Sequence, residues 1–186
     1  MPPAPDGLVS RLVTYPIGVD EPDSCPLLDD IRQAKLDDED LALLALPQVC
    51  KLIAGVSAGS PYLSGLIRQS PERFVNLLRC DPEAQLATLI DELDHSSLSV
   101  GTMTELMVEL RKFKSQAALL TALCDLGGIW PIMTVTDALT RVADAATAQA
   151  VSFLFREAQR NGDSRLSRPG EEVRLHRTGN GEARRL

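Results

Sequence analysis

The chain has 186 residues, a net charge of −7 and only 4% aromatic residues. This length accommodates one domain with a hydrophobic core and leaves little room for two. A core with few rings must be built from Leu, Ala, Val and Ile, which suits packing of helix on helix. The acidic balance offers no electrostatic attraction to nucleic acid, and no apolar run reaches the roughly 18 residues that a membrane span requires.

The N-terminal residues 1–38 differ in composition from the rest of the chain. They hold six prolines and show little periodicity. Between Asp20 and Pro47 there are nine carboxylates and only two basic residues, Arg32 and Lys35. The first residues lack the basic and apolar regions of a secretory signal. We therefore predict a mobile, disordered leader with at most one short helix. The four cysteines are far apart, which predicts reduced thiols and a cytoplasmic protein; they are Cys25, Cys50, Cys80 and Cys124.

A helical pattern begins at Glu39, where apolar residues recur every three or four positions, and Pro47 predicts a kink in it. Three pairs of a capping residue and a proline then predict helix starts, because the side-chain oxygen accepts a bond from a free amide and proline has no amide to leave unpaired. The pairs are Ser60-Pro61, Ser70-Pro71 and Asp81-Pro82. The glycine-rich stretch 55–60 lacks the lysine of a phosphate loop, so it is interpreted as an inter-helix loop.

Two long helices are predicted to close the domain. Thr102 and Glu105 fit a capping box that opens a helix to about Leu126, and Gly127-Gly128 stops it. Trp130-Pro131 then predicts a turn anchored by the ring. A capped start at Thr134–Asp137 opens the last helix, which ends at Asn161-Gly162. The expected buried stripes are Met103, Leu106, Leu110, Phe113, Ala117, Leu120 and Cys124 on the first helix, and Val135, Leu139, Val142, Ala146, Ala150, Phe153 and Leu154 on the second.

These patterns predict an all-α fold, an irregular multi-helix bundle in three segments. Residues 1–38 form the leader, 39–162 the helical domain and 163–186 an unstructured tail. The tail holds six arginines against four carboxylates between Gly162 and Leu186 and has no apolar stripe. This change of sign indicates a segment of different character from the domain.

No catalytic, cofactor-binding or metal-binding residue is predicted. Asp91, Glu92, Asp94 and His95 are a tempting metal cluster, but they fall at a helix end without a second cluster, so a solvated helix end is favoured. The patch from Arg111 to Lys114 could contact nucleotide phosphates or an acidic partner. A solvated helix face is favoured because one basic patch in an acidic protein is weak evidence. His176 lies in the tail and is given no role.

Several of these segments resemble one family when read in order. Ser60-Pro61-Tyr62-Leu63 followed by Ser70-Pro71-Glu72 resembles the bifunctional glutamine synthetase adenylyltransferase/adenylyl-removing enzymes. The resemblance continues through three later segments and covers roughly residues 50–162. These segments run from Arg111 through Ala122-Leu123, from Asp125 to Trp130, and from Thr136 to Ala145.

The resemblance implies the activity of a longer enzyme. In that family this helical region precedes a nucleotidyltransferase domain that uses ATP and Mg²⁺ to attach AMP to a tyrosine of glutamine synthetase. A second such domain removes the AMP by phosphorolysis, and PII-type signal proteins regulate both. The glycine-rich element and the paired aspartates of that domain are expected after residue 162 and do not occur in this chain.

A shift of reading frame would account for the missing element. Permitted codons for residues 176–186, read one nucleotide later, spell Ile-Val-Leu-Gly-Met-Gly-Lys-Leu-Gly-Ala, which resembles the glycine-rich strand and turn of the family. The protein largely fixes the outer bases of each shifted codon, so only the middle base is free. We therefore hypothesise a frameshift near Asp163, natural or from a sequencing error.

The sequence thus predicts an N-terminal helical fragment of an adenylyltransferase that is inactive by itself. ATP and Mg²⁺ are expected only in the full-length parent, with glutamine synthetase and a PII-type protein as its partners. No nucleic acid or membrane partner is expected, and weak self-association is expected where a missing domain leaves an apolar helix face uncovered. The alternative is a non-catalytic helical interaction module that uses the basic tail as a functional arm.

Overall fold

The computed structural model describes residues 7–16 and 25–161. Within these ranges the chain forms eight α-helices, one short 3-10 helix and no strand, which confirms the all-α class. In chain order the elements are η1 (Leu8–Arg11), α1 (Pro26–Arg32), α2 (Asp38–Leu44), α3 (Pro47–Gly59), α4 (Pro61–Gln69), α5 (Pro71–Arg79), α6 (Pro82–Ser99), α7 (Met103–Leu126) and α8 (Ile132–Arg160). The predicted tail and His176 lie outside the described residues.

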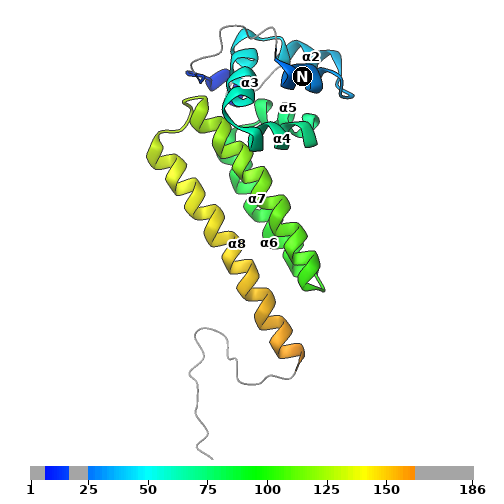
Figure 1. Cartoon of the computed structure of the whole chain (residues 1–186). Coiled ribbons are helices and arrows are strands. Elements are labelled where there is room, and N and C mark those ends of the chain that lie inside the picture. The colour runs from blue at the N-terminus through cyan, green and yellow to red at the C-terminus, as the bar shows by residue number, and fades with distance from the viewer. Residues whose placement is uncertain (1–6, 17–24, 162–186) are drawn as a thin grey trace, which may run out of the picture.

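The helices fall into two parts of different shape (Figure 1). The short elements η1 and α1–α5 gather at one end, and we call them the head. The long helices α6, α7 and α8 extend away from the head, each packed against the other two, and we call them the arm. Helix α4 also contacts α7, and one hydrophobic cluster runs through both parts from Leu8 to Ala138. The described residues therefore share one continuous core.

Local chemistry places most of the helix starts where the sequence predicts them. Ser60 accepts a bond from the Leu63 amide at 3.2 Å, and Asp81 accepts one from the Ala84 amide at 2.7 Å. Thr102 and Glu105 form the predicted capping box at the start of α7. Each such cap contributes roughly 1 kcal/mol of helix stability. Ser70 makes no side-chain cap bond, although α5 still begins at the proline that follows it.

The predicted loop at residues 55–60 is wrong, because α3 continues as a helix through Gly59. Glycine within a helix is explained here by close approach of another segment. A β-carbon built on Gly55 would lie 2.7 Å from ring atoms of Pro16, a distance that real β-carbons do not tolerate. The glycine therefore allows two chain segments to cross closely. Glycine within a helix lowers its stability by about 0.5–1 kcal/mol relative to alanine.

Pro47 separates two helices instead of kinking one. Helix α2 ends at Leu44 and α3 begins at Pro47, with a bend of 72° between their axes. Among the described helices, none is by itself long and apolar enough to cross a membrane. This bent pair meets such a test only when its two helices are counted together, and its apolar side chains, including Leu44, Leu52 and Ile53, are buried inside the head.

The described part of the leader belongs to the hydrophobic core. Leu8 in η1 and Leu27 and Ile31 in α1 are fully buried in the same cluster as the later helices. Short elements such as these show no periodicity over several turns, so the sequence pattern does not distinguish them from a loop. The described residues before residue 38 therefore contribute side chains to the same core as the later helices.

The two long helices differ in how their predicted stripes are used. On α7 the stripe is buried at Leu106, Phe113, Ala117, Leu120 and Cys124, as predicted, and only its first residue, Met103, is exposed. On α8 only Val135, Ala138 and Phe153 are buried, while Leu139 and Leu154 are each 51% exposed.

Helix α8 thus carries a second, uncovered stripe, whose successive members lie three, four or seven positions apart. We call it the outward face; its members are Ile132, Thr136, Leu139, Ala143, Thr147 and Leu154, all of them exposed.

Candidate functional site

The acidic cluster of α6 does not converge on a common point. The His95 ring nitrogen Nδ1 lies 2.6 Å from the backbone oxygen of Asp91, and the Asp94 carboxylate accepts a bond of 2.6 Å from the Gln149 amide. No group of three or more His, Cys, Asp or Glu side chains suited to a metal ion occurs among the described residues. Asp91, Glu92 and His95 are exposed and form a solvated helix face; the predicted helix end is wrong, because α6 continues to Ser99.

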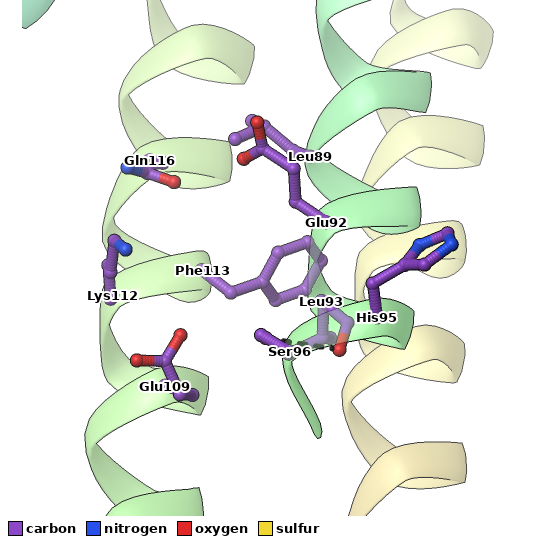
Figure 2. Close-up of a pocket in the computed structure, with 9 residues that line it drawn as sticks. All are labelled: Leu89, Glu92, Leu93, His95, Ser96, Glu109, Lys112, Phe113 and Gln116. Atoms are coloured by element: carbon purple, nitrogen blue, oxygen red, sulfur yellow. Dashed lines mark hydrogen bonds between the residues drawn. The ribbon is translucent and has the colours of Figure 1, made fainter. Parts of the chain in front are cut away.

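The basic patch borders a shallow groove between α6 and α7 (Figure 2). The groove has a volume of about 400 Å³, and the buried ring of Phe113 lies between the two helices at its floor. Lys112 and Glu109 line it from α7, and Glu92 lines it from α6. One lysine and two glutamates line the groove, so it has no positive field that would attract a phosphate. Ser96 also lines it, but its hydroxyl donates to the Leu93 carbonyl at 3.3 Å, so the geometry indicates a solvated helix face without an activated nucleophile.

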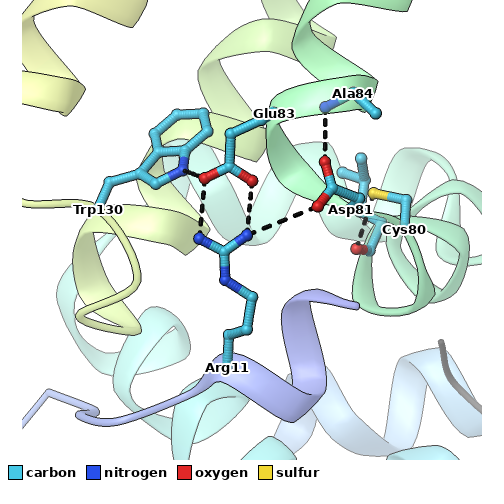
Figure 3. Close-up of polar contacts among 7 residues, drawn as sticks. Arg11, Cys80, Asp81, Glu83, Ala84 and Trp130 are labelled. Atoms are coloured by element: carbon cyan, nitrogen blue, oxygen red, sulfur yellow. Dashed lines mark hydrogen bonds and ion pairs between the residues drawn. The ribbon is translucent and has the colours of Figure 1, made fainter. Parts of the chain in front are cut away.

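A polar cluster that the sequence does not predict joins three distant segments (Figure 3). The Arg11 guanidinium donates two hydrogen bonds to the Glu83 carboxylate, one of them 2.8 Å long, and lies 3.7 Å from Asp81. The Trp130 indole nitrogen donates to the same carboxylate at 2.8 Å. Arg11 lies at the end of η1, Glu83 in the first turn of α6, and Trp130 in the connector from α7 to α8. The predicted anchoring role of Trp130 is confirmed, since its ring is buried.

The cluster holds one carboxylate firmly in its charged form. Hydrogen bonding to Arg11, with a further bond from Trp130, lowers the pKa of Glu83 to about 2. The same hydrogen bond raises the pKa of Arg11 above its usual value. A glutamate that stays ionised and doubly paired cannot exchange a proton near neutral pH. The arrangement is therefore suited to holding segments together and is unsuited to acid–base catalysis.

Two of the cysteines have thiols that burial makes unreactive. No disulfide joins the four cysteines, all of which lie in the described residues, and burial raises the pKa of Cys80 to about 11. Burial also raises the pKa of Cys124, far above its ordinary range. Because the thiolate is the reactive species, these two groups are inert at neutral pH.

A wider groove lies between α6 and α8 and has a volume of about 640 Å³. Its polar residues are already bonded, since Gln149 donates to Asp94 at 2.6 Å and Arg156 donates to the carbonyl of the neighbouring Ser97 at 2.8 Å. Leu98 and Val151 stand exposed at its sides, and Val151 lies beside the outward face of α8. The arrangement can bury the apolar side chains of another segment and offers no reactive group.

A protein-family model described as glutamate-ammonia ligase adenylyltransferase matches residues 50–181. The match begins in α3 and extends past α8 into residues outside the described ranges. It includes the caps at Ser60, Asp81 and Thr102, together with the whole of α8.

Curated relatives of much greater length share this region. The bifunctional glutamine synthetase adenylyltransferase/adenylyl-removing enzyme of Bradyrhizobium diazoefficiens is 42% identical over 73% of this chain and 13% of its own length. That of Xanthobacter autotrophicus is 40% identical over the same shares, and that of Rhodopseudomonas palustris strain HaA2 is 35% identical over 72% and 13%. The chain thus spans about 13% of these relatives, and no solved structure matches it.

Proposed function

Because this chain belongs to the glutamate-ammonia ligase adenylyltransferase family, we propose that it is a helical part of an enzyme that attaches AMP to glutamine synthetase and removes it. The observation that carries the proposal is the family match over residues 50–181, joined by relatives with both activities in their names. The parent enzyme uses ATP and Mg²⁺, modifies a tyrosine, removes AMP by phosphorolysis and responds to a PII-type signal protein.

The helices of this chain serve to support and dock rather than to react. The described carboxylates do not fit Mg²⁺, because Asp94 is bonded to Gln149 and the acidic side chains of α6 do not gather around one point. The pKa of Glu83 is lowered by its pairing with Arg11 and Trp130, which fixes this group in a structural role. ATP and Mg²⁺ therefore belong to other parts of the parent.

The outward face of α8 is the docking surface for the rest of the enzyme. A helix that is apolar on two sides is normally covered on both, and Ile132 is 70% exposed while Leu139 and Leu154 are half exposed. The relatives contain far more polypeptide than this chain, so they have segments available to cover this face. Docking there would hold the catalytic part against the arm.

The experiment is an adenylylation assay on glutamine synthetase with labelled ATP and Mg²⁺. The purified chain alone should transfer no label. The Bradyrhizobium diazoefficiens enzyme without its matching region should transfer more label when the chain is added. Addition of the double variant Leu139→Glu, Leu154→Glu in place of the natural chain should give a smaller increase. Label transferred by the chain alone, or no gain on mixing, would contradict the proposal and favour an unrelated interaction module.

The frameshift near Asp163 is a separate part of the proposal. Its support is the codon arithmetic over residues 176–186, in which a one-nucleotide shift yields a glycine-rich segment of the family type. The coding DNA tests it directly. A long open frame in the shifted phase, with paired aspartate codons downstream, is the expected result, and a stop codon soon after the shift in that phase would overturn it.

A further inference from the structure

Residues 7–16 cross the junction of head and arm, and we call them the strap. The Leu8 amide donates to the Cys80 carbonyl at 2.8 Å, just before α6. The amides of Val13 and Thr14 both donate to the Gly127 carbonyl, at 2.9 and 3.1 Å, just after α7. The strap is thus attached through backbone bonds to the residue before α6 and the residue after α7, both at the head end of this antiparallel pair (Figure 1).

Three glycines receive alternate residues of the strap. A β-carbon on Gly127 would lie 2.6 Å from Leu12, one on Gly128 would lie 2.7 Å from Thr14, and one on Gly55 would lie 2.7 Å from Pro16. Alternate side chains of an extended segment point to the same side, so the three approaches share the geometry of a peptide lying in a groove. Val13, between them, is 75% exposed.

Side chains fix the strap at both ends of this glycine-lined surface. Arg11 holds Glu83, which also accepts from Trp130 (Figure 3). At the other end the Lys51 ammonium lies 4.7 Å from the centre of the Tyr15 ring and donates to its hydroxyl at 3.2 Å. Main-chain bonds with pockets for alternate side chains are the usual basis of recognition of extended peptides.

We propose that Gly55, Gly127, Gly128, Glu83 and Trp130 form a peptide-binding groove, which residues 7–16 of the same chain occupy. The groove fits a segment in which an arginine ends a short helical turn and is followed by an extended stretch with an apolar residue, a small hydroxyl residue and a proline at alternate positions. Because Gly127, Gly128 and Trp130 belong to the connector between α7 and α8, an occupied groove fixes the angle between these helices. Release of the strap loosens that angle.

The test separates the strap from the chain after folding. A protease cleavage sequence is inserted between Asp20 and Glu21, and the full-length folded chain is cut there. The N-terminal piece should remain bound, and a fluorescent synthetic peptide of residues 1–18 should exchange for it with a saturable anisotropy signal. An Arg11→Ala peptide should bind at least about tenfold more weakly, since it loses charge-assisted bonds, whereas a Val13→Ala peptide should bind as the natural one does.

A matched pair of changes on the two sides tests the groove itself. Gly55→Ala favours the helix intrinsically but collides with Pro16, so it should weaken binding of the natural peptide in the cut chain. A Pro16→Gly peptide should recover most of the affinity for the Gly55→Ala chain. Hydrogen exchange at residues 127–133 of the uncut Arg11→Ala chain should be faster than in the natural chain.

Three outcomes would overturn the proposal. The first is loss of the piece after cleavage with no binding of the labelled peptide. The second is loss of helical circular dichroism on cleavage, which would make the strap an inseparable part of the core. The third is equal binding of the natural and Arg11→Ala peptides.

Discussion

The head and the arm bury their helices in different ways. In the head, five short α-helices surround one another, and ion pairs tie neighbours together at Arg68–Asp30, with a 2.7 Å contact, and at Arg79–Asp40. In the arm, three long helices pack side by side, and α8 contributes only three buried side chains from 29 residues. The described helices of the head thus cover one another on several sides, whereas the arm leaves one side of α8 exposed.

The largest expected effect comes from the core of the head. Phe74 is fully buried there, so Phe74→Ala should lower the free energy of unfolding by about 3–5 kcal/mol. Leu139→Ala on the outward face should change it by no more than about 0.5 kcal/mol. Urea unfolding followed by circular dichroism measures both. Similar losses for the two variants would show that the outward face is covered in this chain.

Acid should weaken the contact between head and arm through Glu83. The pKa of Glu83 is about 2 in the folded chain, below the usual value of about 4.3 for glutamate. Its pairing therefore stabilises the fold fully above about pH 4.3, and this stabilisation is lost as pH falls toward 2. Glu83→Gln should therefore flatten the decline of unfolding free energy over this range. Glu92→Gln, at an exposed glutamate of the same helix, is the control and should leave the decline unchanged.

The capping box of α7 should have a smaller effect, confined to one end of the arm. Thr102→Ala removes the bond to the Glu105 amide and should cost about 1 kcal/mol. Thr102→Ser keeps the hydroxyl and should recover most of that loss. Thermal unfolding of the three proteins compares them, and equal midpoints for all three would mean that the start of α7 frays in solution.

The smallest expected effect on stability accompanies a change in association. Leu154→Glu should leave the unfolding free energy nearly unchanged, because this side chain is half exposed. It should nevertheless reduce any concentration-dependent self-association, since it places a charge on the outward face. Sedimentation at several concentrations measures this. An unchanged association constant would place the contact elsewhere on the molecule.

The helix starts and ends that depend on neighbouring residues can be predicted from the sequence. Helix starts at Pro61, Pro71 and Pro82 follow from single caps and prolines, and the start and end of α7 follow from its capping box and glycine pair. The start of α8 is two residues earlier than Thr134, because Pro131 takes the cap position without a side-chain bond.

Contacts between distant residues lie beyond such prediction. Arg11 and Glu83 are separated by 72 positions, and nothing near either one indicates the pairing. The need for glycine at residue 55 likewise arises from Pro16, which lies 39 positions earlier in the chain. Periodicity marks Leu139 and Leu154 as apolar but does not show whether this chain or another segment covers them. The candidate site is therefore predicted only at Trp130, whose ring needs a partner wherever it is buried.

Because α8 is long, a small rotation at the α7–α8 connector produces a large displacement at its far end. Helix α8 has 29 residues, so it is about 43 Å long. A rotation of about 5° at residues 127–131 would displace its far end by nearly 4 Å, about the thickness of one methyl layer. The far end of α8 is bonded to the end of α6 and to the α6–α7 turn, since Arg156 donates to the Ser97 carbonyl at 2.8 Å and Arg160 to the Gly101 carbonyl at 3.5 Å. A rotation at the connector would therefore have to shift these bonds. A change of a few degrees at the connector would be large enough to shift one packed surface against another.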